Sequence, residues 1–148
     1  MEKFKIYLDI CSFNRPYDNQ LQIRIKVEAE SKLYIQELVK KEKLELVWSY
    51  ILDYENSENP YKERRESIEG WKELCNLDID ANDQILASVA VLEKSGIKTK
   101  DAIHLSCAIE AKCDYFITTD DKLIKKTSKL TKIKVVSPID FLKVIEET

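Results

Sequence analysis

The chain has 148 residues, 44% of them hydrophobic and 34% charged, which suits one folded domain over residues 1–148 and excludes a disordered protein. Its 24 basic and 27 acidic side chains give a net charge of −3, which argues against capture of nucleic acid by overall charge. No apolar stretch approaches the roughly 20 residues of a membrane span, and the first residues do not resemble a secretory signal, so we expect a cytoplasmic protein.

The first half of the chain alternates apolar runs with helical patterns. In the long helix expected there, Ile25, Leu33, Ile35, Leu38 and Val39 approximate a buried stripe. In chain order we predict a strand at Phe4–Asp9, a helix over Leu21–Lys43, a strand at Leu44–Ser49, a helix capped by Ser49, a surface helix over 61–74 and an edge strand at Cys75–Ile79.

The second half continues the alternation. We predict a helix over Asn82–Lys94, a helix opening after Thr99, a strand at Asp114–Thr119, a short helix over Asp121–Leu130, a strand at Ile133–Ser137 and a terminal helix over 139–147. Strands that are nearly continuously apolar and alternate with helices indicate a parallel sheet covered on both faces. The predicted fold class is therefore α/β, with helices on both sides of the sheet.

Four acids fall at or just beyond predicted strand ends. Asp9 closes the first strand and Asp120 closes the strand at 114–119, while Glu55 and Asp101 lie in the first turns of helices. In a parallel sheet the carboxyl ends of the strands share one edge, where functional groups collect. We therefore expect these four side chains to converge.

Each acid alone has a structural explanation, such as a turn, a helix cap or a favourable position in a helix dipole. Together, four like charges in one place cost energy unless protons or a divalent cation neutralise them. Carboxylate oxygens without a His/Cys cluster are the ligands that Mg²⁺ or Mn²⁺ prefers. Such an ion activates water and polarises phosphoryl oxygens, so the pattern predicts a metal pocket for phosphoryl chemistry.

The remaining reactive residue types do not suggest a different site. The four cysteines show no CxxC pair and no histidine cluster, so free thiols are expected instead of zinc. The single histidine, His104, lies one turn beyond Asp101, and we expect it to support the site instead of acting as its base. Base stacking is an alternative role for several aromatic residues, although we expect core or groove-lining positions for them: Trp48, Trp71, Tyr50, Tyr54 and Tyr61.

Three segments resemble the PIN-domain ribonucleases, which include toxin nucleases of the VapC type. YLDICSFNRPYD resembles the first strand and first acid of the family, and WSYILDYE its glutamate. The segment KTKDAIHLSCAIEAKCDYFITTDD is the most specific, because an acid opens an apolar helix and a strand ending in T-x-D follows. The resemblance assigns catalytic and metal-binding roles to Asp9, Glu55, Asp101 and Asp120, with Asp121 as a further metal ligand.

The resemblance implies a three-layer αβα sandwich with a mainly parallel sheet of about five strands. It also implies hydrolysis of RNA by metal-activated water with Mg²⁺ or Mn²⁺. Such toxins commonly form homodimers and bind a small antitoxin protein whose gene lies beside their own. A second copy of this chain and an antitoxin are therefore candidate partners.

The sequence departs from the family pattern at Ile10, where a Thr or Ser often follows the first acid. Ser12 and Asn14 are the nearest polar substitutes for supporting Asp9 or a substrate phosphate. Arg15 and Lys122 each follow closely on a proposed metal ligand, which makes them candidate phosphate contacts.

Two other functions remain open on the sequence alone. A catalytically inactive PIN-like module that binds nucleic acid or protein would explain Ile10 and the acidic net charge. A receiver-like phosphoacceptor domain is also α/β with an acidic Mg²⁺ pocket, although the expected lysine at its last strand is not evident.

Overall fold

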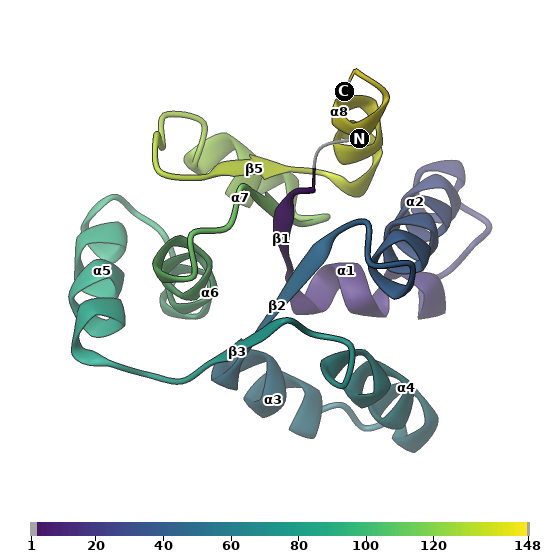
Figure 1. Cartoon of the computed structure of the whole chain (residues 1–148), viewed down its shortest axis with the longest axis horizontal. Coiled ribbons are helices and arrows are strands. Elements are labelled where there is room, and N and C mark those ends of the chain that lie inside the picture. Colours follow the sequence, from purple (N-terminus) through teal and green to yellow (C-terminus); the bar gives the residue numbers. More distant parts are fainter. Residues whose placement is uncertain (1–2, 148) are drawn as a thin grey trace.

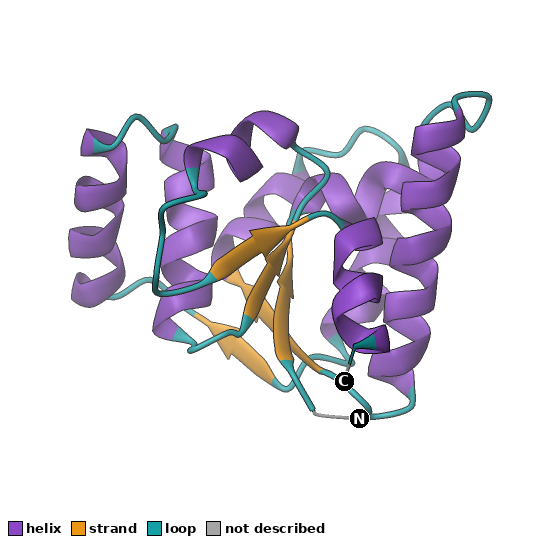
Figure 2. Ribbon diagram, turned by 90° about the horizontal axis from the view of Figure 1, so that it is seen from above, coloured by secondary structure: helices purple, strands orange, loops and turns teal. Residues whose placement is uncertain are grey.

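A parallel sheet forms the centre of the computed structural model, which describes residues 3–147. The five strands are β1 Lys5–Leu8, β2 Glu45–Ser49, β3 Leu77–Ile79, β4 Tyr115–Ile117 and β5 Lys134–Val136, in the spatial order β3-β2-β1-β4-β5. Helices α2 (Ile23–Lys40) and α8 (Pro138–Glu146) lie on one side of the sheet, and α5 (Asp83–Lys94) and α6 (Thr99–Glu110) on the other (Figure 1, Figure 2). The predicted three-layer α/β sandwich with five strands is confirmed.

The central strands are buried on both faces, as their continuous apolar sequences predicted. In β1 and β4 nearly every residue is buried, and Tyr7, Phe116 and Trp48 are fully enclosed in the core. The rings of Tyr7 and Phe116 stack across the two strands with centroids 5.2 Å apart. Strand β3 is largely exposed and lies at the edge of the sheet, as expected for the short run at 75–79.

Five further helices, one of them a 3₁₀ helix, are described within residues 3–147. They are α1 Ile10–Asn14, the 3₁₀ helix η1 Arg15–Tyr17, α3 Tyr50–Ser57, α4 Lys62–Lys72 and α7 Asp121–Lys126. No periodicity predicted α1 or η1, because five and three residues are too few to show one. Helix α7 ends four residues earlier than predicted. None of the helices within residues 3–147 has the length and apolar character needed to cross a membrane.

The predicted buried stripe of α2 is partly wrong. Leu33 is 48% exposed, whereas Glu28, Lys32 and Gln36 are buried at intervals of four residues. The helix therefore turns a polar row inward, and it packs along η1 and α8. Hydrophobic periodicity cannot detect a buried row of this kind, because its members look like surface residues.

The order of the strands creates a switch point beside β1. The chain leaves β1 for β2 on one side, while β4 pairs with β1 on the other. Ligands of doubly wound sheets bind in the crevice at such a point, beyond the carboxyl ends of the strands. Asp9 follows β1 and Asp120 follows β4, so two of the predicted acids lie at this position.

Candidate metal centre at the switch point

Asp9 is the most deeply buried of the predicted acids, with 5% of its surface exposed. It caps α1, because its Oδ1 accepts the backbone N–H of Ser12 at 3.0 Å. The Thr118 hydroxyl also bonds the carboxylate. Burial disfavours the charged form and raises the pKa of Asp9 from 3.8 to about 6, although these hydrogen bonds and the nearby His104 oppose the rise.

Thr118 ties Asp9 to Asp120 across the switch point. Its Oγ1 accepts the backbone N–H of Asp120 at 3.1 Å, while the same hydroxyl bonds Asp9. Asp120 caps α7, and its Oδ1 accepts the N–H groups of Lys122 at 3.0 Å and Leu123 at 3.2 Å. A helix cap alone would explain an acid at position 120. In the structure Asp120 both caps α7 and lies beside Asp9.

Asp101 lies in the first turn of α6 and is partly buried. Burial raises the pKa of its carboxyl group, and the negative charges of Asp120 and Glu55 raise it further. His104 and Lys98 act in the opposite direction. Three of the predicted acids therefore influence one another directly.

Glu55 is held by a buried chain of hydrogen bonds that starts in the core of the sheet. Its Oε1 contacts His104 Nε2, and His104 Nδ1 lies 2.5 Å from the Tyr7 hydroxyl. That hydroxyl in turn lies 2.6 Å from Ser49 Oγ. His104 is 3% exposed and holds Glu55, which is the supporting position expected for it. Ser49 occupies the cap position of α3, but its side chain does not cap the helix.

The charges of all four acids act on the thiol of Cys11 in α1. Cys11 is an exposed residue, but desolvation of its thiol raises the thiol pKa to about 12, and the charges of Asp9, Asp120, Glu55 and Asp101 each add to the rise. The acids do not meet at a point, since no three His, Cys, Asp or Glu side chains within residues 3–147 form a ready chelating cluster. All four cysteines are free thiols, as expected.

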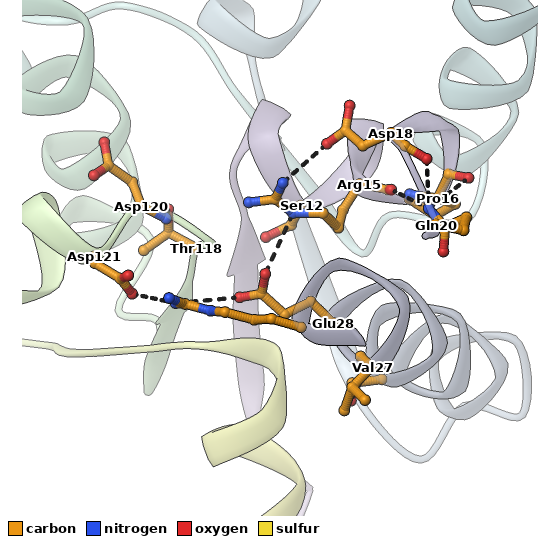
Figure 3. A network of polar contacts seen from close by, with 12 residues as sticks. Ser12, Arg15, Pro16, Asp18, Gln20, Val27, Glu28, Thr118, Asp120 and Asp121 are labelled. Atoms are coloured by element: carbon orange, nitrogen blue, oxygen red, sulfur yellow. Dashed lines mark hydrogen bonds and ion pairs between the residues drawn. The ribbon is translucent and has the colours of Figure 1, made fainter. Parts of the chain in front are cut away.

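Asp121 belongs to a separate network of charges. Its carboxylate pairs with Arg24 of α2, which also lies 3.7 Å from Glu28, and Arg15 lies 3.4 Å from Glu28. Figure 3 shows Asp120 and Asp121 directed away from each other, with Asp121 facing this network. Because the guanidinium of Arg24 holds the pKa of Asp121 below its usual range, the charge of Asp121 is already matched inside the protein.

The predicted substrate contacts occupy different environments. Ser12 is fully buried and donates its hydroxyl to the Ile117 carbonyl at 3.1 Å, so it positions Asp9 and is out of reach of a substrate. Arg15 is paired with Asp18 at 3.1 Å and with Glu28, so its charge is also compensated. Asn14 lines a groove beside Glu55, and Lys122 is exposed at the start of α7.

Three supporting residues were not predicted. Thr118 is visible in the sequence only as one hydroxyl of the run TTDD, and nothing there shows that it bonds two acids. Tyr7 reads as an ordinary core residue of β1. Arg24 reaches Asp121 from a helix nearly a hundred residues earlier in the chain, and no local pattern announces such a contact.

The sequence matches the model of one protein family. The family model described as PIN domain matches residues 6–130, which is most of the chain. The chain belongs to the PIN domain family. A search of curated proteins finds no match.

Solved structures support the PIN fold at low sequence identity. VapBC-1 from nontypeable Haemophilus influenzae has a TM-score of 0.61 at 20% identity, covering 91% of this chain and 98% of that one. VapBC2 from Rickettsia felis, bound to a DNA fragment from their promoter, has a TM-score of 0.54 at 18% identity, covering 90% and 98%. PAE2754 from Pyrobaculum aerophilum has a TM-score of 0.56 at 12% identity, covering 98% and 91%.

The family match narrows the functions left open by the sequence. PIN domains are a nuclease family with toxin-like members. The resemblance of the three sequence segments to this family is confirmed. The receiver-like alternative belongs to a different family and is set aside. The choice between an active and an inactive PIN domain depends on the carboxylates.

Proposed function

We propose that this PIN domain is a divalent-metal-dependent endoribonuclease that hydrolyses RNA phosphodiester bonds. The observation that carries the proposal is that Asp9 and Asp120 follow the adjacent strands β1 and β4 at the switch point, while the charges of Glu55 and Asp120 act on Asp101. These acids come from four separate segments of the chain, so their common location reflects the fold and not their neighbourhood in sequence.

The donor groups fit Mg²⁺ or Mn²⁺. All four are carboxylates, and hard oxygen ligands are the ones that these ions prefer. Burial disfavours the charged form of Asp9 and Asp101 and raises the pKa of both, and the negative charges of Asp120 and Glu55 add to the rise at Asp101. A bound ion would neutralise this charge, activate water for attack on phosphorus and polarise the phosphate.

The protein itself orients these acids. Thr118 joins Asp9 to Asp120, and His104, fixed by Tyr7, holds one oxygen of Glu55. Preorganised partners of this kind keep ligands in place, and their loss typically costs 10–100-fold in metal affinity or activity. Lys122 is exposed directly after Asp120 and Asp121, and Asn14 lines a groove together with Glu55, so both are our candidates for contacts to the RNA backbone.

The VapBC neighbours support a toxin role within this proposal. We propose that this chain also binds a small antitoxin protein and that it assembles as a homodimer. An RNA substrate would place the activity in the cytoplasm. Co-purification of the chain with the product of an adjacent short reading frame would test the antitoxin directly.

A catalytically inactive PIN-like binding module is the second candidate. Two observations favour it, namely Ile10 in place of the hydroxyl residue and the absence of a ready chelating cluster within residues 3–147. This module would bind RNA or protein without any dependence on metal.

Cleavage of RNA with and without metal distinguishes the two candidates. Wild-type protein with Mn²⁺ is expected to cleave unstructured RNA, EDTA should stop cleavage, and Asp101→Asn should lower the rate at least about 100-fold. Asp83→Asn is the matched control, because Asp83 also lies in the first turn of a helix but is exposed and lies outside the acid group. Cleavage that survives both EDTA and Asp101→Asn would refute the metal mechanism, and a complete lack of cleavage would favour the binding module.

A further inference from the structure

An open groove of about 460 Å³ leads away from the carboxylates. Ile10 and Glu55 line it on the side of the acids, and Tyr61 and Arg64 line it near the start of α4. Asn14 and Lys100 also contribute to its walls. The groove is built on α1, α3 and α4, and α3 contacts both of the others (Figure 1). A molecule bound at the acids would therefore continue into this groove.

In the groove the Arg64 guanidinium is stacked over the ring of Tyr61, and this stacked pair is called the platform below. The Arg64 guanidinium lies 4.1 Å from the centre of the Tyr61 ring and 5.0 Å from that of Tyr17, and it donates to the Tyr17 carbonyl at 3.4 Å. Tyr61 is 56% exposed, so much of its ring surface is free. Exposed aromatic rings and guanidinium planes are the groups on which proteins stack single-stranded bases.

A lysine lies between the platform and the acids. Lys100 is the residue before Asp101, it lines the groove, and its Nζ lies 5.8 Å from the ring of Tyr54, which is 52% exposed. This places a positive charge where the backbone of a strand would leave the acid group. An ammonium group at such a position suits a phosphate contact.

The charges of the groove favour a single strand over a duplex. Asp18 and Glu58 also line it, so Arg64 and Lys100 do not form the continuous basic surface that a double helix would need. Stacking requires base faces that are open, and a duplex hides them. Stacking with one nearby lysine therefore suits unpaired bases.

We infer that this groove is a base-binding subsite for single-stranded RNA, in which one base stacks beside the cleaved bond on the face of the Tyr61 ring that Arg64 leaves free. The inference rests on the proposed function and adds a substrate preference to it. It assigns to Tyr61 and Arg64 a role that a solvated helix face would not have.

Binding measured in EDTA tests the subsite without cleavage. Fluorescence anisotropy of a short, labelled, unstructured RNA should show that Tyr61→Ala weakens binding about 5–100-fold, whereas Tyr61→Phe retains it. Tyr34→Ala is the control, because Tyr34 is 55% exposed on α2 and does not line the groove. An unlabelled RNA duplex of the same sequence should compete poorly. Circular dichroism melts should confirm that the variants fold.

A stacking signal gives a second readout. In Tyr61→Trp the new indole should be quenched by single-stranded RNA, and the wild type, whose tryptophans are Trp48 and Trp71, gives the background signal to subtract. Equal RNA binding by Tyr61→Ala and Tyr34→Ala, or duplex competition as strong as that of the single strand, would overturn the subsite. Tyr61-dependent binding without Mn²⁺-dependent cleavage would instead uphold the subsite and refute the nuclease, so the two failures are distinguishable.

Discussion

Asp9→Asn is expected to lower RNA cleavage at least about 100-fold and, in EDTA at pH 8, to raise the stability of the fold. The first effect follows because the variant loses a proposed metal ligand. The second follows because Asp9 is 5% exposed and burial raises its pKa to about 6, so its charged form opposes folding at pH 8. One pKa unit corresponds to about 1.4 kcal/mol, and we expect a gain of about 1–3 kcal/mol. Asparagine retains the oxygen that caps α1.

The sign of the pH dependence is a further check on Asp9. Its pKa is higher in the folded state than in the unfolded chain, so its contribution to stability is full below pH 4 and is lost as the pH rises through 6. The advantage of Asp9→Asn should therefore be present at pH 8 and vanish near pH 3.5. Urea unfolding at both pH values, with Asp83→Asn as the control, measures it. A variant that is less stable than wild type at pH 8, or one that cleaves normally, would contradict this assignment.

Lys32→Met is expected to stabilise the protein by on the order of 2–4 kcal/mol at pH 7. Lys32 is 3% exposed, and its Nζ lies 5.3 Å from the ring of Phe13 and 5.9 Å from that of Trp71. No ion pair to it is found among residues 3–147, and burial lowers its pKa from 10.5 to about 7. A methionine of similar length fills the same space without a charge to bury.

The gain from Lys32→Met should depend on pH in a defined direction. The unfolded chain keeps the lysine proton up to about pH 10.5, while the folded protein releases it near 7, so the stability of the wild type rises with pH between these values. The advantage of the variant should be largest at pH 7 and below and should shrink toward pH 10. Lys40→Met, on the exposed face of the same helix, is the control and should show neither effect. Denaturant unfolding at pH 6.5 and 9.5 measures both, and a destabilised Lys32→Met protein would show that the ammonium group is favourably bound.

The sheet was predictable because its signals are local. Runs such as FITT and IKVV identify buried strands, and their alternation with helices indicates parallel pairing. The order of strands and helices along the chain was therefore enough to predict that Asp9 and Asp120 lie at the same edge of the sheet. Gly96, in the left-handed region with φ of 89°, lies in the turn between α5 and α6, just after the predicted end of the helix at Lys94.

The supporting contacts of the site were not predictable because they depend on packing. The row Glu28, Lys32 and Gln36 is buried although its members have the composition of a surface, and Leu33 is exposed although it is apolar. The bond from His104 to Glu55 and the pair of Arg24 with Asp121 each join distant segments through side-chain geometry. For this reason the sequence suggested Asp121 as a ligand, while the structure places its charge against an arginine.

Titration with Mn²⁺, followed by the loss of the paramagnetic resonance signal of the free ion, tests the carboxylate site most directly because it needs no substrate. The wild type and Asp83→Asn should bind Mn²⁺ in the same way, and Asp101→Asn should bind it far more weakly. Equal binding by Asp101→Asn, or no binding by the wild type at millimolar Mn²⁺, would contradict a metal centre formed by these four acids.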